Sequence, residues 1–244
     1  MQKLPPRTAR LHYIDPAAVS DPALYASYAE RMSPEERERE ERYHFDKHRR
    51  IHRVARALVR STLSRYLGVA PEGLRFRENP WGRPELSYPQ GSGLSWNVAH
   101  TDGLVVMLVA DGCTVGVDVE DWLHRRAPLD VADRFFAPPE VAELARLPPE
   151  QKQRRFFEYW TLKESYIKAR GMGLALPLEQ FAFDPRDPSA PTISFHGIDD
   201  DPRDWQFAFL APTPQHLVAC AFQRGRGPDW TLESVPTIPL WTTA

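Results

Sequence analysis

Residues 94–121 carry the pattern that most restricts how this chain can fold. Three apolar stretches follow one another there, separated by the turn sequences TDG at 101–103 and ADG at 110–112. Short apolar stretches bounded by Gly and Asp are typical of successive strands, because tight turns join antiparallel neighbours. The pattern therefore predicts that this region builds a sheet.

The last of these stretches, TVGVDVED at 114–121, places two carboxylates inside a run of valines. Side chains at i and i+2 of a strand share a face, so the valines would face a core while Asp118 and Glu120 lie together on the other face. Like charges so close are unfavourable unless water, a proton or a cation separates them. Gly116 precedes them on that face, where the missing side chain would let a ligand approach. From these residues alone, a strand with one solvated face is an equally good interpretation.

The segment 33–68 has the apolar periodicity of a helix. It begins at Ser33, a helix N-cap followed by Pro34, and predicts one amphipathic helix or two in sequence that end near Gly68. One face is basic and is either solvated or an anion site. The arginines that gather on this face are Arg49, Arg53, Arg56 and Arg60.

A second helix is predicted for 155–170, apolar around most of its circumference and therefore largely buried. It nevertheless holds Glu164 and Lys168, four residues apart on one face. A surface ion pair is the simpler interpretation, but charges on so apolar a helix are rarely left unpaired. A third carboxylate here could join Asp118 and Glu120 in a Mg²⁺ site, since that ion prefers oxygen ligands.

Composition disfavours several classes of protein. The formal net charge of −2 gives no global field for nucleic acid or an anionic membrane. The two cysteines, Cys113 and Cys220, give neither a disulfide framework nor a metal motif. No apolar run approaches the roughly 20 residues of a membrane span, and the N-terminus lacks the apolar stretch of a signal peptide. We therefore expect a cytoplasmic protein.

A weak internal repeat suggests two halves. Residues 94–110 and 205–222 share the order of a strand with Trp, a short turn and an apolar strand, and each follows a helical region. We expect an α+β fold of two similar subdomains, 1–114 and 115–244. Asp118 and Glu120 would lie at the junction, where ligand sites often form.

Four motifs resemble those of the Sfp-type 4′-phosphopantetheinyl transferases. G-V-D-V-E at 116–120 and W-T-L-K-E-S-Y-I-K at 160–168 match the strand and helix motifs of that family, in its order and at its separation. W-N-V-A-H at 96–100 and G-R-P at 82–84 resemble two further stretches, with Ala99 in place of the usual Ser and Arg83 in place of the usual Lys. The resemblance implies two lobes related by a pseudo-twofold axis.

The resemblance also implies the binding site. Coenzyme A and Mg²⁺, or Mn²⁺, would bind between the lobes, with Asp118, Glu120 and Glu164 as metal ligands. Lys168 and His100 would contact the pyrophosphate, and Glu164 would act as the general base, directly or through a water.

Further positions are implied for the coenzyme itself. Arg83 would still meet phosphate, with the bidentate reach of a guanidinium. The other positions are Gly82, Pro84, Asn97, Asp118 and Lys163. Candidates for the 3′-phosphate are Arg39, Arg50 and His52, with Arg49 and Arg53 as competitors.

The implied reaction transfers 4′-phosphopantetheine from coenzyme A to a serine of an apo acyl, peptidyl or aryl carrier domain, giving the holo carrier and 3′,5′-ADP. By family likeness the chain would be monomeric. The segment 129–155 is a docking candidate for the carrier, as a mobile flap or as an ordinary connecting helix. Two other classes stay open: a metal-dependent phosphodiester hydrolase with the same three carboxylates, and a module that binds coenzyme A without chemistry.

Overall fold

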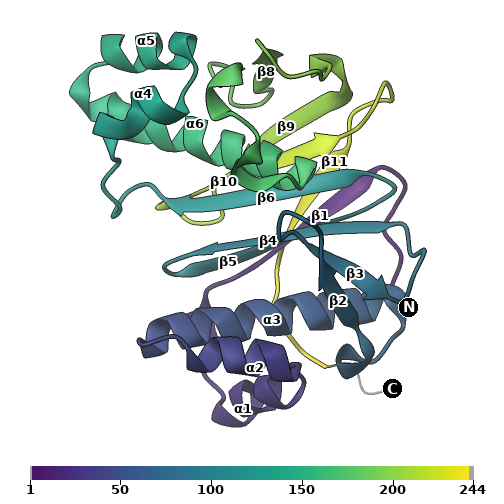
Figure 1. The fold of residues 1–244 in the computed structure, drawn as a ribbon. Coiled ribbons are helices and arrows are strands. Elements are labelled where there is room, and N and C mark those ends of the chain that lie inside the picture. The colour runs from purple at the N-terminus through teal and green to yellow at the C-terminus, as the bar shows by residue number, and fades with distance from the viewer. Residues whose placement is uncertain (1, 242–244) are drawn as a thin grey trace.

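The computed structural model describes residues 2–241, with the side chain of residue 174 excepted, and has an α+β fold, as the sequence predicted (Figure 1). The helices are α1 (Pro22–Glu30), α2 (Pro34–Glu41), α3 (Asp46–Leu67), α4 (Ala132–Phe135), α5 (Pro138–Arg146) and α6 (Pro149–Arg170). The strands of the first half are β1 (Thr8–Ile14), β2 (Arg75–Glu78), β3 (Pro84–Tyr88), β4 (Leu94–Thr101) and β5 (Leu104–Asp111). The later strands are β6 (Thr114–Asp121), β7 (Phe181–Asp184), β8 (Thr192–Phe195), β9 (Trp205–Leu210), β10 (His216–Gln223) and β11 (Thr231–Pro236).

The two halves repeat one order of elements. A first strand (β1 or β6) leads to a long helix (α3 or α6), a small hairpin (β2–β3 or β7–β8) and a second hairpin (β4–β5 or β9–β10). The sheets are ordered β11-β1-β5-β4 and β6-β10-β9, so in both halves the first strand pairs with the second strand of the second hairpin. The weak repeat in the sequence thus corresponds to two similar α+β units.

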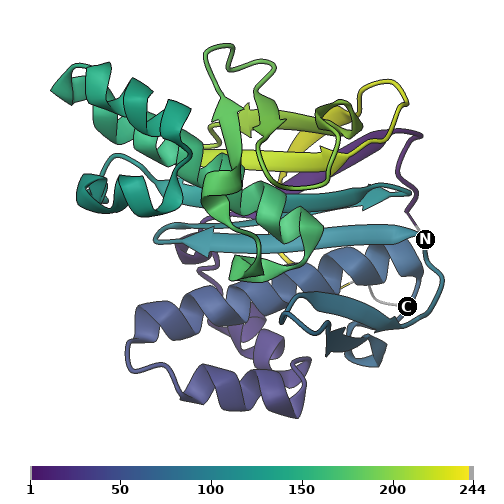
Figure 2. The ribbon, with the colours of Figure 1, turned by 45° about the horizontal axis from the view of Figure 1, so that its top comes forward.

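The units stack as helix, sheet, sheet and helix, with the sheets facing each other in the middle (Figures 1 and 2). Alternate residues of β5 show this arrangement: Leu104, Val106 and Leu108 pack in the core between the sheets. Val105 and Met107 instead pack in the core that α3 covers. The valines of β6 also lie in the central core, as the sequence predicted.

The helix ends follow the local sequence signals. Ser33 and Glu36 form a capping box at the start of α2, and the segment 33–68 forms two helices rather than one. The long helices α3 and α6 both stop at a left-handed glycine, Gly68 with φ 67° and Gly171 with φ 64°. Helix α6 begins at Pro149, earlier than predicted.

Side chains join the two sheets at β4 and β6. The Oδ1 atom of Asn97 accepts a hydrogen bond from the Val117 N–H at 2.9 Å, and Ser95 Oγ accepts one from Val115 N–H at 3.2 Å. Asn97 is buried in this seam, so its side chain connects the halves.

The last strand returns to the first half. Strand β11 pairs in parallel with β1, with Thr8 opposite Thr231, and so adds to the N-terminal sheet. The expected boundary between the subdomains, after residue 114, lies at the start of β6. Strand β11 follows this boundary in the sequence but belongs to the sheet of the N-terminal half. Within residues 2–241, none of the helices combines the length and apolar character that crossing a bilayer requires.

Candidate active site

Helix α6 packs directly on β6 at Gly116. A Cβ atom at this position would lie 2.1 Å from the Ser165 carbonyl oxygen and 2.4 Å from the Ala169 nitrogen. The expectation that Gly116 admits a ligand was therefore wrong, because the helix backbone of the same half fills this space.

The close packing brings the acidic strand and the charged helix face together. The Lys168 Nζ atom lies 2.6 Å from Asp118 Oδ1. Asp118 and Glu120 are only 6% and 8% exposed, and Glu164 is half-buried. Arg125, five residues beyond Glu120, forms an ion pair with the Glu120 carboxylate.

The charges of this group do not balance. Burial and the charge of Asp118 raise the pKa values of both Glu120 and Glu164. Desolvation disfavours the charged form of Lys168, but the attraction of Asp118 and the two glutamates outweighs it and raises the pKa of the amine. Three carboxylates thus share two cations, Lys168 and Arg125.

These carboxylates fit a hard divalent cation. Asp118 Oδ2 is buried and has no hydrogen-bond partner within residues 2–241, and the group carries excess negative charge. Carboxylate oxygens are the ligands that Mg²⁺ and Mn²⁺ prefer. As the side chains stand over residues 2–241, three or more acidic, His or Cys side chains do not gather closely enough to form a ready-made metal site.

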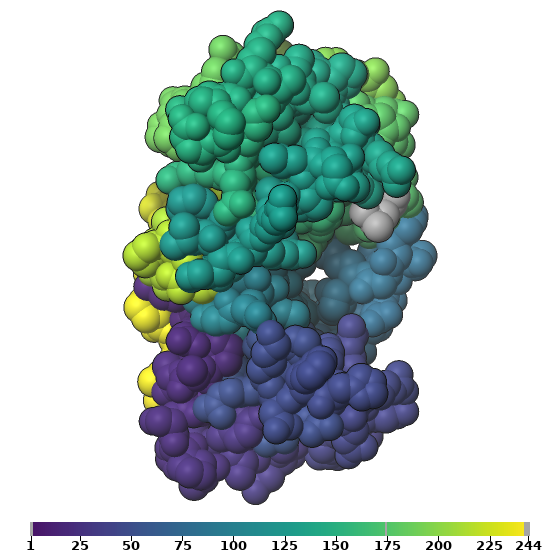
Figure 3. Space-filling model, turned by 90° about the vertical axis from the view of Figure 1, so that its left-hand side faces the viewer, coloured from purple at the N-terminus to yellow at the C-terminus, as the bar shows by residue number. Residues whose placement is uncertain are grey.

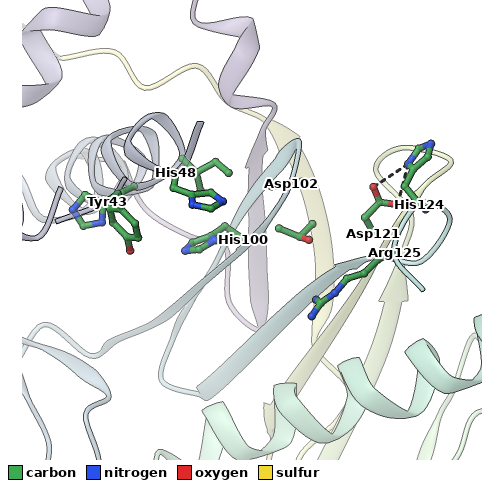
Figure 4. Close-up of a pocket in the computed structure, with 10 residues that line it drawn as sticks. Tyr43, His48, His100, Asp102, Asp121, His124 and Arg125 are labelled. Atoms are coloured by element: carbon green, nitrogen blue, oxygen red, sulfur yellow. Dashed lines mark hydrogen bonds and ion pairs between the residues drawn. The ribbon is translucent and has the colours of Figure 1, made fainter. Parts of the chain in front are cut away.

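His100 faces this group from the other half, at the end of β4. Desolvation, and to a smaller extent the nearby charges of Lys168 and Arg56, lowers the pKa of His100, although the residue is exposed. The ring lines a cavity of about 530 Å³, and Tyr43, Asp102 and Arg125 line it as well (Figure 4). Figure 3 shows the molecule hollowed between its two halves.

A second cavity, of about 630 Å³, has more arginines than glutamates in its wall. Arg39, Arg56 and His52 line it, together with Pro84 of the G-R-P turn. Over residues 2–241 neither Arg39 nor Arg56 has an ion-pair partner, and the Arg56 Nε atom is buried without a hydrogen bond. Arg56 was not among the expected coenzyme-binding residues; the sequence signal was its place on the basic face of the helix.

Comparisons with known proteins identify the family. Residues 21–112 match the family described as 4′-phosphopantetheinyl transferase, N-terminal, and residues 114–221 match the 4′-phosphopantetheinyl transferase superfamily. The 4′-phosphopantetheinyl transferase HetI of Nostoc sp. is 39% identical over 161 residues, which are 65% of this chain and 68% of HetI. A 4′-phosphopantetheinyl transferase of Bacillus subtilis is 32% identical over 168 residues, 66% of this chain and 72% of its own.

The chain belongs to the 4′-phosphopantetheinyl transferase superfamily. This agrees with the resemblance of its motifs, and the enzyme is a transferase.

Lys163 of the transferase lies away from the carboxylate group. Its Nζ atom is 2.8 Å from Glu140 Oε2 and donates to the carbonyl oxygens of Leu178 at 2.8 Å and Phe181 at 2.6 Å. An ammonium has three N–H groups, so these partners use all of them. Glu140 also accepts from the Phe183 N–H at 2.8 Å. This network anchors α5, in the segment expected to be a flap or a connecting helix, to α6.

Arg83 of the transferase is also committed to the fold. Its guanidinium donates to the carbonyl oxygens of Ala169 at 2.6 Å and Val115 at 3.2 Å. Gly82 has φ 84° and lets the turn approach the C-terminus of α6, where the amide of Asn79 donates to the Gly171 carbonyl at 2.8 Å. The cation thus satisfies the Ala169 carbonyl, which the helix end leaves free, and a carbonyl group of β6.

The remaining 3′-phosphate candidates differ in their availability. His52 donates Nε2–H to the Glu36 carbonyl at 3.0 Å, and burial followed by the charge of Arg56 lowers its pKa to about 4. Neutral His52 therefore offers a phosphate no N–H. Arg49, Arg50 and Arg53 have protein partners: Asp46 at 3.0 Å, the Pro16 carbonyl at 2.9 Å and Glu40 at 2.6 Å, respectively.

Proposed function

We propose that the transferase binds coenzyme A across the cleft between its halves and moves the 4′-phosphopantetheine group to a serine of an apo carrier domain. The observation that carries the proposal is the 2.6 Å contact between Lys168 and Asp118. This contact joins α6 to β6 on one side of the cleft between the halves, and His100 lies on the other side. Localisation in the cytoplasm and action as a monomer are parts of this proposal.

Lys168 and His100 would hold the pyrophosphate. Lys168 stays positively charged because three nearby carboxylates raise the pKa of its amine. His100 lies across the cleft with its lowered pKa, so at neutral pH it would donate one N–H to a phosphate oxygen rather than a full charge. Fixed donors aimed at phosphate oxygens stabilise the charge that develops during transfer.

Arg39 and Arg56 would hold the 3′-phosphate in the basic cavity. Both line the cavity, and neither has an ion-pair partner among residues 2–241. A phosphate would supply the negative charge and the acceptor that Arg56 Nε lacks. Pro84 and the G-R-P turn lie at the edge of the same cavity and would border the nucleotide.

Asp118, Glu120 and Glu164 would hold Mg²⁺, or Mn²⁺ in its place. When bound, the ion would neutralise charge on the diphosphate and polarise it toward attack. Burial, and to a smaller extent the charge of Asp118, raises the pKa values of both glutamates, and a bound cation would offset both effects.

Glu164 would accept the proton of the carrier serine. In the reaction the serine oxygen forms a bond to the β-phosphorus, the bond from that phosphorus to the bridging oxygen breaks, and 3′,5′-ADP leaves. Without the cation, burial raises the pKa of Glu164, which favours its acting as a base. Transfer through one water serves the same purpose if the carboxylate stays engaged with the cation.

The test is to incubate the protein with coenzyme A, Mg²⁺ and a panel of apo carrier domains and to weigh the carriers by mass spectrometry. We expect a mass gain of one phosphopantetheine group on at least one carrier, and little gain with Glu164→Gln. Glu158→Gln is the matched control, because Glu158 lies on the same helix but pairs with Arg154 at 3.1 Å. Release of free phosphopantetheine without a carrier would instead indicate a hydrolase, and normal Glu164→Gln turnover would exclude Glu164 as the base.

A further inference from the structure

The turn between β4 and β5 decides where His100 lies. His100 and Thr101 are the last residues of β4, and Asp102 and Gly103 form the turn, with φ 79° at Gly103. The turn is exposed, and within the hairpin it is held only by the regular pairing of β4 with β5. Its position over the cleft therefore depends on contacts from other elements.

One such contact is weak. The Lys47 Nζ atom of α3 lies 2.9 Å from Asp102 Oδ2, but the two side chains are 59% and 64% exposed. Solvent screens an ion pair of this kind, so it holds the turn only loosely.

The other contact is buried and comes from the opposite half. His216, at the start of β10, is 1% exposed, and its Nε2 atom lies 2.8 Å from the Asp102 carbonyl oxygen. Its Nδ1 atom lies 2.7 Å from Thr213 Oγ1. A carbonyl only accepts, so Nε2 carries a hydrogen and donates it to Asp102, while Thr213 holds the other ring nitrogen.

His216 also lies beside the end of the acidic strand. It pairs with Asp121, the residue after Glu120, and the Trp122 N–H donates to the neighbouring Gln215 carbonyl at 3.0 Å. The ring contacts the turn closely: a Cβ atom at Gly103 would lie 3.4 Å from His216 Cε1. One buried ring thus spans from the end of β6 to the turn that follows His100.

We propose that His216 is a positioning residue that fixes His100 relative to Asp118 and Glu120 across the cleft. This inference rests on the proposed function, since it assigns His100 to the pyrophosphate. His216 touches neither the carboxylates nor His100; it acts through the main chain of Asp102. Fixing this distance matters because displacement of a catalytic group by about 1 Å can lower a rate about a hundredfold.

The test compares His216→Phe, which keeps a ring but loses the donor, with His216→Gln, which can still donate to the Asp102 carbonyl. Each variant is measured for amide hydrogen exchange at residues 100–103, for kcat and KM of transfer, and for Tm. We expect His216→Phe to speed exchange in the turn and to lower kcat about tenfold to a hundredfold. His216→Gln should stay within about threefold of the parent protein. Lys47→Gln is the control, since it removes the exposed contact to the same residue and should leave exchange and kcat unchanged.

A second variant keeps the test decisive if His216→Phe does not fold. Thr213→Val leaves the ring in place but removes the hydroxyl that orients it, so it should speed exchange in the turn with an intermediate loss of kcat. Parent-like exchange and kcat in the folded His216 or Thr213 variant would overturn the proposal, as would a loss of Tm alone. If the parent protein transfers no phosphopantetheine, the proposed function fails, while hydrogen exchange still decides whether His216 holds the turn.

Discussion

Gly116→Ala is the substitution that most directly tests how the site is assembled. The added Cβ atom would lie 2.1 Å from the Ser165 oxygen and 2.4 Å from the Ala169 nitrogen. Both are main-chain atoms of α6, so no side-chain rotation can relieve the contact. The helix must move away from β6.

The size of the movement follows from the contact. Real Cβ atoms essentially never approach other heavy atoms within 3.0 Å, so α6 must retreat by about 0.9 Å. A similar displacement of Lys168 would lengthen its 2.6 Å contact with Asp118 to about 3.5 Å, beyond hydrogen-bond distance. Overpacking of this kind costs about 3 kcal/mol, which for a chain of this length lowers Tm by about 6–12 °C.

The assays are thermal and urea unfolding, and carrier modification at a temperature where the variant is folded. We expect the loss of stability together with a fall in kcat of about a hundredfold, because Glu164 and Lys168 move with the helix. Gly112→Ala is the control: its Cβ would meet nothing within 4 Å, so only its φ of 77° costs energy, about 1 kcal/mol. If Gly116→Ala were as stable and active as the parent, the packing argument would be refuted.

Three further outcomes follow from buried or unpaired charges. Arg56→Gln should weaken the binding of coenzyme A by about 2 kcal/mol, which is roughly thirtyfold in Kd. The binding of 3′-dephospho-coenzyme A, measured by the same calorimetry, should not change. Lys163→Met should lower the unfolding free energy by about 3–5 kcal/mol, because Glu140 then stays buried without a cation, and adding Glu140→Gln should restore part of it in urea titrations. Burial, and to a smaller extent the charge of Arg65, lowers the pKa of His12 from 6.5 to about 4. Between these two pH values the unfolded chain therefore binds a proton at His12 that the folded protein does not. The unfolding free energy should therefore fall as pH decreases from 6.5 to 4, and His12→Gln should flatten this dependence; an unchanged slope would contradict the assignment.

The local pattern of the chain predicted much of the fold. The short apolar stretches and turn sequences in 94–121 predicted β4, β5 and β6, and Ser33, Gly68 and Gly171 marked helix ends correctly. These features depend on neighbours within a few residues, where backbone sterics and side-chain periodicity act. Strands β1 and β11 were not predicted, because each acquires its place by pairing with the other across more than two hundred residues.

The sequence by itself determined the chemistry that the site can offer: carboxylates on one face of a strand, and a glutamate and a lysine on one face of a helix. Only the tertiary structure decided how each charge is used. It packed Gly116 against a helix, bonded Lys163 and Arg83 to groups of the fold, left Arg39 and Arg56 without an ion-pair partner in the described part of the chain, and placed His216 against the turn beyond His100. The reason is that the free energy of a charge depends on its burial and its partners, and in this protein those partners come from segments distant in the chain.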